Sequence, residues 1–140
     1  MEQHYGAMSV ILKWLINVKI NDLFNIKNCD SIDDYNQLHN KSLEFLQKVL
    51  NLDYKFIVIT HHIPLLELIT EDYKDNPYNQ WFATDLKHLM NNSNIKHWFF
   101  GHTHTPSESK YYDIEFHCNS IGYPSENSNK NYNKSIDVIE

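Results

Sequence analysis

Three of the nine histidines in this chain lie directly after apolar runs that read as buried strands. His61 follows KFIVIT (residues 55–60), whereas His102 and His104 follow HWFFG (residues 97–101). Neutral imidazole is a common ligand of zinc, iron, nickel and copper, and manganese is a further candidate. In extended backbone, two residues separated by one lie on the same side, roughly 7 Å apart. This spacing suits two metal ions about 3.5–4 Å apart, each bound by one imidazole, as in two-metal phosphoryl chemistry.

A plain polar turn is the other interpretation of G-H-T-H, because a motif of four letters with one free position recurs by chance. The metal-site interpretation depends on an ordered combination: a strand that ends in T-H-H, then a helix, then a strand that ends in G-H-T-H. Gly101 permits a turn that brings the backbone close to such a centre. Five further histidines are interpreted as ordinary surface or packing residues: His4, His39, His88, His97 and His117.

The motifs VITHHIP (58–64) and WFFGHTH (98–104), in this order and spacing, resemble the last two motifs of the calcineurin-like metallophosphoesterases. The resemblance continues through INDLFNI (20–26), YNQLHNKSLEFL (35–46) and NSIGYPSE (119–126), so that it covers nearly the whole chain. It implies an α/β fold that is the C-terminal half of a sandwich of two β-sheets flanked by helices.

The resemblance also implies roles for individual side chains. His61 and His102 match the ligands of one metal ion, and His104 matches a ligand of the other. The intact family site holds two divalent ions, for which manganese, iron and zinc are the candidates. Three further residues are expected near the substrate or behind the ligands: His62, Asn119 and Tyr123.

The motifs of the family's first half do not occur in this sequence. There is no D-x-H, no G-D-x-x-D and no G-N-H, which in the family supply the bridging aspartate, further ligands and the general-acid histidine. No catalytic residue is therefore assigned. We expect one partial domain over residues 1–140, in which residues 1–30 form an irregular segment in place of the first half, and a complementing N-terminal chain is a candidate partner.

Three functional hypotheses follow. The first is a metal-dependent phosphoesterase that hydrolyses a phosphate mono- or diester at a two-metal site, with this chain inactive alone. The second is a relic or pseudoenzyme that binds metal weakly or serves as an interaction module. The third is an unrelated α/β domain in which G-H-T-H is a turn.

The hydrophobic pattern predicts the elements that would position these residues. Helices are predicted over 31–50 and 79–91, and strands over 55–60, 95–100, 111–118 and 135–140. The strand at 55–60 is predicted to be buried on both faces. A long loop with one helical turn at 65–68 is predicted over residues 63–78, between the first strand and the second helix. A polar loop is predicted over 125–134. T-H-H and G-H-T-H both follow strands, where ligand sites of open α/β sheets gather.

Composition limits the function further. The 140 residues carry a net charge of −6, with twelve lysines and no arginine, which argues against nucleic-acid binding. Any bound phosphate must then be held by metal, histidine, lysine or backbone N–H groups. Cys29 and Cys118 have no C-x-x-C spacing and are interpreted as free thiols. The apolar patch at 7–18 is too short to span a membrane and lacks signal-peptide features, so the sequence predicts a soluble, cytoplasmic protein.

Overall fold

The computed structural model describes residues 25–91 and 94–126, which form a mixed α/β structure. The chain divides into two compact units, with the boundary between Lys48 and Val49. Helix α3 (Ile32–Leu50) dominates the described part of the first unit, and an open four-stranded sheet with short helices forms the second. Predictions for residues 1–24, for the strand at 135–140 and for most of the loop at 125–134 lie outside the described residues. No helix in the described ranges is long and apolar enough to cross a membrane.

Helix α3 confirms the helix predicted over 31–50. Ser31 provides the cap: its hydroxyl accepts the Asp34 N–H at 3.2 Å and donates to Asp34 Oδ2 at 2.7 Å. Asp34 Oδ2 also accepts the backbone N–H of Asp30 at 3.2 Å. Backbone donors that have no partner within the first helical turn are thereby satisfied. The hydrogen bond from the Ser31 hydroxyl lowers the pKa of the Asp34 carboxyl.

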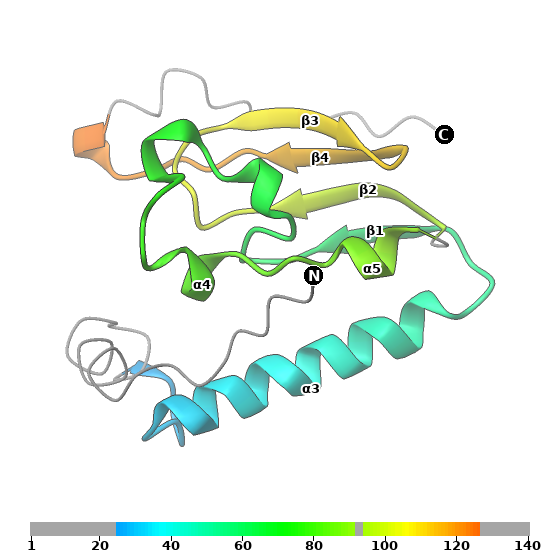
Figure 1. Ribbon diagram of the computed structural model, residues 1–140, viewed down its shortest axis with the longest axis horizontal. Coiled ribbons are helices and arrows are strands. Elements are labelled where there is room, and N and C mark those ends of the chain that lie inside the picture. The colour runs from blue at the N-terminus through cyan, green and yellow to red at the C-terminus, as the bar shows by residue number, and fades with distance from the viewer. Residues whose placement is uncertain (1–24, 92–93, 127–140) are drawn as a thin grey trace. The chain divides into compact units, whose positions relative to one another are not determined.

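The sheet has the strand order β1-β2-β4-β3 (Figure 1). Its strands are β1 (Phe56–Ile59), β2 (Ile95–Phe100), β3 (Ser107–Tyr111) and β4 (Ile114–Cys118). β2 pairs in parallel with both β1 and β4, whereas β3 and β4 are antiparallel. The strands predicted at 55–60 and 95–100 are therefore present, and their parallel pairing brings their carboxyl ends to the same edge of the sheet.

The single strand predicted over 111–118 is wrong in detail. This segment contains the last residue of β3, a two-residue turn at Tyr112–Asp113, and β4. Both turn residues have positive φ, 53° and 61°, as a tight hairpin turn of the primed type requires. The sequence pattern misses most of β3 because Ser-Glu-Ser-Lys has low strand propensity and the strand lies at the sheet edge, where polar residues are tolerated.

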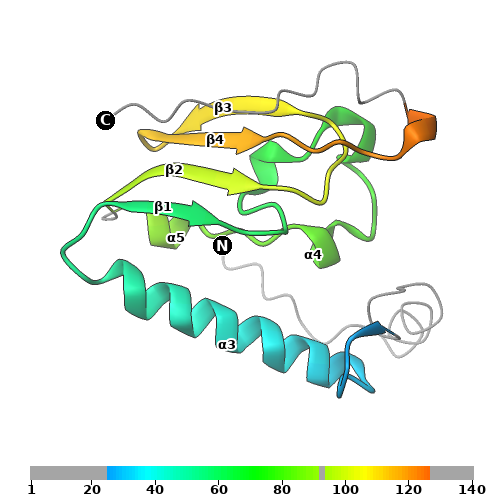
Figure 2. The same cartoon turned by 180° about the vertical axis from the view of Figure 1, so that it is seen from behind.

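One face of the sheet carries the core of the second unit. Trp98 and Phe116 are fully buried on it, with ring centroids 6.0 Å apart. The segments that contain α4 (Asn79–Phe82) and α5 (Lys87–Met90) lie against one face of the sheet, as Figures 1 and 2 show. On the opposite face of β1, Ile57 is 54% exposed and Ile59 is 78% exposed. The prediction that this strand is buried on both faces is therefore wrong, because the described elements of this unit cover only one.

The helix predicted over 79–91 is interrupted. Ala83 is extended and forms a parallel bridge with Ile63, in which the Ile63 N–H donates to the Phe82 carbonyl and the Thr84 N–H donates to the Ile63 carbonyl, each at 2.9 Å. These bonds replace the helical hydrogen bonds of the segment, so that α4 and α5 remain as separate short helices. Three apolar side chains of this segment nevertheless reach the core: Trp81, Leu86 and Met90 are buried.

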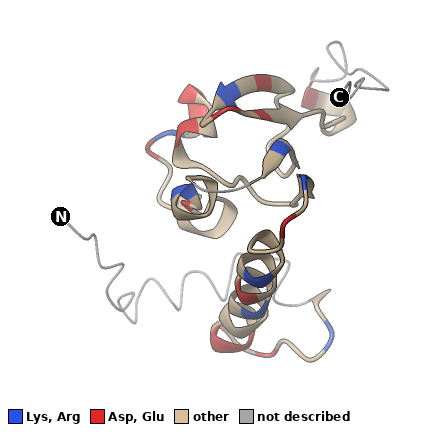
Figure 3. Cartoon of the chain, turned by 90° about the vertical axis from the view of Figure 1, so that its right-hand side faces the viewer, with Lys and Arg blue, Asp and Glu red and all other residues tan. Residues whose placement is uncertain are grey.

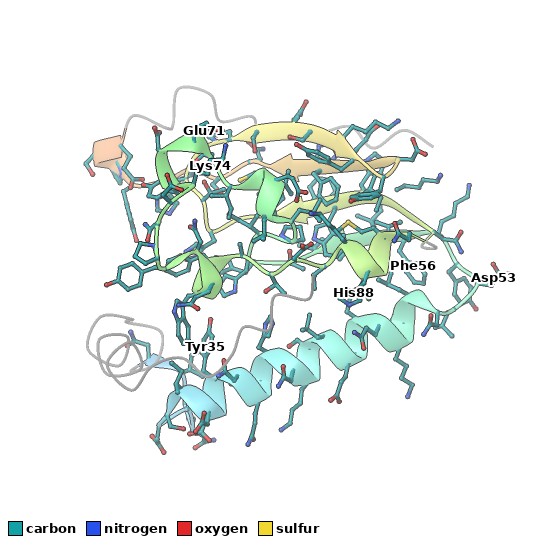
Figure 4. The ribbon with its side chains drawn as sticks, in the orientation of Figure 1. Tyr35, Asp53, Phe56, Glu71, Lys74 and His88 are labelled. Atoms are coloured by element: carbon teal, nitrogen blue, oxygen red, sulfur yellow. The ribbon has the colours of Figure 1, made fainter. Side chains whose placement is uncertain are left out.

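The loop over 63–78 contains the predicted helical turn, found as η1 (Leu66–Leu68), and a second turn, η2 (Glu71–Tyr73). Lys74 and Glu71 form an ion pair at 3.0 Å on the outside of this loop, where Figure 4 shows the two side chains beside each other. The Asn79 side-chain amide donates to the carbonyls of Tyr73 at 2.6 Å and Lys74 at 3.1 Å. These bonds tie the loop to the start of α4.

Candidate metal centre

The T-H-H and G-H-T-H segments meet at one edge of the sheet. Beyond the ends of the parallel strands β1 and β2, the Thr60 N–H donates to the Phe99 carbonyl at 2.9 Å. The Gly101 N–H donates to the His61 carbonyl at 3.0 Å. Backbone pairing thus continues past both strands and holds the two loops in register, so that the histidines that follow them lie side by side.

His61, His62 and His102 form the histidine cluster of this edge. His61 Nε2 and His102 Nδ1 are 3.4 Å apart. The three rings have centroid separations of 5.2–5.3 Å, and one ligand atom from each residue lies within 4.8 Å of the others. Two nitrogens bound to one tetrahedral zinc at about 2.0–2.1 Å would be separated by roughly 3.4 Å. The His61–His102 pair therefore has the spacing of two ligands that share one ion.

His102 adopts a left-handed backbone conformation, with φ of 63°. The Thr103 N–H donates to the Gly101 carbonyl at 2.7 Å, so that His102 is the middle residue of a tight three-residue turn. Its ring stacks on Phe82 with centroids 4.2 Å apart. The turn for which Gly101 was expected to supply backbone freedom is therefore centred on His102 instead. A Cβ on Gly101 would only come into ordinary contact with His61, at 3.6 Å from its carbonyl oxygen.

His104 lies apart from the histidine cluster and contacts an acid. Its Nδ1 is 2.7 Å from Glu126 Oε2, which also accepts the backbone N–H of Tyr123 at 2.7 Å. The bond from Tyr123, followed by that from His104, lowers the pKa of the Glu126 carboxyl, which is therefore ionised at neutral pH. The rings of His104 and Tyr123 meet edge to face at 4.7 Å. A carboxylate on one ring nitrogen leaves the other nitrogen as the ligand atom, which is the common arrangement around protein-bound metals.

A cavity of about 480 Å³ borders this region. It is lined by residues of the loop after β1, of α4 and of the G-H-T-H segment, together with Glu126: Ile63, Ile69, Thr70, Asp72, Tyr73, Asn76, Asn79, Phe82, His102, Thr103, His104, Thr105 and Glu126. Its volume is typical of small-ligand sites. The hydroxyls of Thr70 and Thr103 are buried without a hydrogen-bond partner. The described lining thus offers amides, hydroxyls, imidazoles and two carboxylates, and no lysine is among these residues.

The predicted site residues fall into two groups. His61, His62 and His102 are brought together, whereas His104 and Tyr123 lie beside Glu126. Asn119 directly follows β4 and is half-buried. Sequence reasoning missed Glu126 and Phe82. Glu126 ends the NSIGYPSE stretch, which was the one available signal for it.

The described residues show no continuous basic stripe. Along the ribbon of each unit, lysine positions alternate with aspartate and glutamate positions (Figure 3). Several are paired locally, as Lys74 is with Glu71 and Lys87 is with Glu67. The second pair raises the pKa of the Lys87 ammonium and lowers that of the Glu67 carboxyl, chiefly through the hydrogen bond between them.

A comparison with curated proteins finds a relative of this chain. The chain is 33% identical over 138 residues to the uncharacterized protein L509 of Acanthamoeba polyphaga mimivirus, a match that covers 88% of this chain and 49% of that protein. The chain therefore spans about half the length of this curated relative. No protein-family model matches the chain, and no solved structure matches it.

Proposed function

We propose that this chain supplies the imidazole ligands of a calcineurin-like metallophosphoesterase site and acts in the metal-dependent hydrolysis of a phosphate mono- or diester. The observation that carries the proposal is the separation of 3.4 Å between His61 Nε2 and His102 Nδ1, at the carboxyl ends of two adjacent parallel strands. The resemblance of VITHHIP and WFFGHTH to the family motifs supports it.

The side chains have distinct tasks in this proposal. His61 and His102 bind one divalent ion of manganese, iron or zinc, with His62 beside them. His104 binds the second ion through Nε2, while Glu126 accepts the proton on Nδ1 and orients the ring. Ions held in this way would supply charge stabilisation to the phosphoryl group and activation of the nucleophile. The three imidazole side chains are suitable ligands for manganese, iron and zinc, since all three metals bind imidazole.

The cavity beside His102 and His104 is the proposed substrate pocket. Because the chain has no arginine and the part of the lining that the structure describes has no lysine, the phosphate would be held by metal and by neutral donors. Phe82 supplies an apolar wall against which the organic part of an ester can pack.

Catalysis requires groups beyond this set. The D-x-H, G-D-x-x-D and G-N-H motifs, which would supply a bridging carboxylate and a general acid, do not occur in the sequence. The relative L509 is about twice as long as the matched region. We infer that a complementing N-terminal segment completes both the site and the two-sheet sandwich, and that the chain alone binds metal without turnover.

A non-catalytic interaction module is the second candidate. The observation that favours it is the exposure of Ile57 and Ile59, on the face of β1 that the described elements of the second unit leave open. Adjacent exposed isoleucines on an edge strand are suited to association with another sheet or chain. Such a module would bind its partner with or without metal.

The test is a titration of the purified chain with Mn²⁺ and Zn²⁺, together with a chromogenic phosphate ester as substrate. We expect binding that weakens strongly in His61→Ala and His102→Ala, and is unchanged in His88→Ala, a matched change at an exposed histidine on α5. Turnover is expected only after addition of a complementing segment that carries D-x-H, G-D-x-x-D and G-N-H. Metal binding that is indifferent to both His61→Ala and His102→Ala would overturn the proposal.

A further inference from the structure

A second group of potential metal ligands lies on the face of the sheet opposite to Trp98 and Phe116. His97 in β2 is paired in register with Glu115 in β4, and Phe99 is paired with His117. Because side chains alternate along a strand, His97, Glu115 and His117 project from the same face. Trp98 and Phe116 occupy the intervening positions and face the core. This group is thus built across two strands, on the side of the sheet opposite to the core.

The three ligand atoms have the spacing of a small-ion site. His97 Nδ1 is 3.2 Å from His117 Nε2 and 3.5 Å from Glu115 Oε2, and His117 Nε2 is 4.0 Å from Glu115 Oε2. A triangle with these edges has a circumscribed radius of about 2.1 Å, so one point lies at that distance from all three atoms. Zinc binds imidazole nitrogen at about 2.0–2.1 Å and carboxylate oxygen at about 2.0–2.2 Å.

The burial of His117 is a separate observation that points to a ligand. The residue is only 6% exposed, and its Nδ1 is buried without a hydrogen-bond partner. The nearest carboxylate oxygen to this nitrogen is Glu108 Oε1 in β3, at 4.0 Å. A small approach of Glu108 would let Nδ1–H donate to it, which places the lone pair on Nε2, facing His97 and Glu115. Ligating histidines commonly donate their other N–H to a carboxylate in this way.

We propose that His97, Glu115 and His117 form a zinc-type metal site that is separate from the centre at the strand ends, with Glu108 as the positioning residue for His117. Three protein ligands of imidazole and carboxylate type leave a fourth position open, next to the half-exposed side chain of Glu115. Phe99 stacks on the His117 ring with centroids 4.8 Å apart and restricts its rotation. The bound ion joins β2 to β4 on the face that the described elements of this unit leave uncovered.

The experiment uses the full chain with His61→Ala and His102→Ala, which removes the cluster at the strand ends and leaves the sheet face intact. Zn²⁺ binding is measured by calorimetry, and Co²⁺ absorption reports the ligand geometry. We expect one equivalent of bound Zn²⁺. Adding Glu115→Gln or His97→Ala should weaken binding at least tenfold, and adding Glu108→Gln should weaken it by about 10–100-fold. Glu44→Gln, at an exposed position of α3, is the matched control and should change nothing.

Glu115→Gln is the decisive variant, because the Glu115 side chain is 53% exposed and its replacement does not disturb the core. A change at His117 is not used, because this side chain is buried and its loss would disturb folding. Circular dichroism confirms that each variant is folded. The proposal is overturned if the folded double variant binds no Zn²⁺, or if both Glu115→Gln and His97→Ala leave the affinity unchanged. The phosphoesterase proposal is untouched by either outcome, since the His61–His102 pair that carries it is absent from this background.

Discussion

The Glu126 carboxylate accepts a hydrogen bond from His104 Nδ1 at 2.7 Å and another from the Tyr123 N–H at 2.7 Å. The first bond joins the G-H-T-H loop to η3 (Pro124–Glu126), the turn that follows β4. It determines which ring nitrogen of His104 is left for a ligand. The orientation of His104 is therefore imposed from a segment that lies 22 residues further along the chain.

The Glu126 carboxyl should titrate below the range of an ordinary glutamate, because two hydrogen bonds favour its ionised form. Since the pKa is lower in the folded protein than in the unfolded chain, the contacts contribute stability above the usual glutamate pKa. That contribution is lost as the pH falls through the lowered value. NMR titration of the carboxyl carbon measures this midpoint. His104→Ala should raise it in part, because the Tyr123 N–H remains, and an unchanged midpoint would contradict the assigned hydrogen bond.

Replacement of His102 by glycine and by alanine separates backbone strain from ligation. His102 has φ of 63°, a region that costs a residue with a Cβ roughly 1–2 kcal/mol relative to glycine. We expect His102→Gly to be more stable than His102→Ala by about 1 kcal/mol in urea unfolding. Both variants should lose binding of the metal ion that His61 and His102 are proposed to hold together. Equal stability of the two variants would show that the left-handed turn is not retained.

Removal of the Ser31 hydroxyl should destabilise α3. The hydroxyl accepts the Asp34 N–H and donates to its carboxylate, and loss of an N-cap serine typically costs about 1 kcal/mol. Far-ultraviolet circular dichroism during urea unfolding measures the change. Ser42→Ala is the control, because the Ser42 hydroxyl lies within the helix and bonds only the Leu38 carbonyl at 3.0 Å. A smaller effect at Ser31 than at Ser42 would contradict the capping role.

Adjacent positions in β1 test which face of the sheet is covered. Val58 is buried, whereas Ile59 is 78% exposed. Val58→Ala should cost roughly 1–3 kcal/mol of unfolding free energy, and Ile59→Lys should change it by less than about 0.5 kcal/mol. If Ile59 contributes to an interaction surface, Ile59→Lys should also weaken binding to a complementing segment, measured by calorimetry. A loss of stability as large as that of Val58→Ala would show that the chain itself covers this face.

Local sequence patterns were sufficient to predict those helices and strands whose formation depends mainly on residues close together in the chain. The hydrophobic pattern predicted α3, and the apolar runs before T-H-H and G-H-T-H predicted β1 and β2. The expectation that His61 and His102 approach each other followed from a general rule, because parallel neighbouring strands bring their carboxyl ends together. The prediction of each separate helix or strand needed no knowledge of which other segments pair with it.

Several other features required the tertiary structure, because each depends on pairing between distant segments. The bridge between Ile63 and Ala83 interrupts the helix expected over 79–91, and the register of β2 with β4 brings His97 to Glu115 and His117. Nothing in the residues adjacent to His97 indicates which strand will lie beside it. The sequence by itself therefore determined the types of ligand and the strands that carry them. Sheet order and register decided which ligands meet, since hydrogen bonds between strands, unlike those within a helix, join residues whose separation along the chain is not set by local geometry.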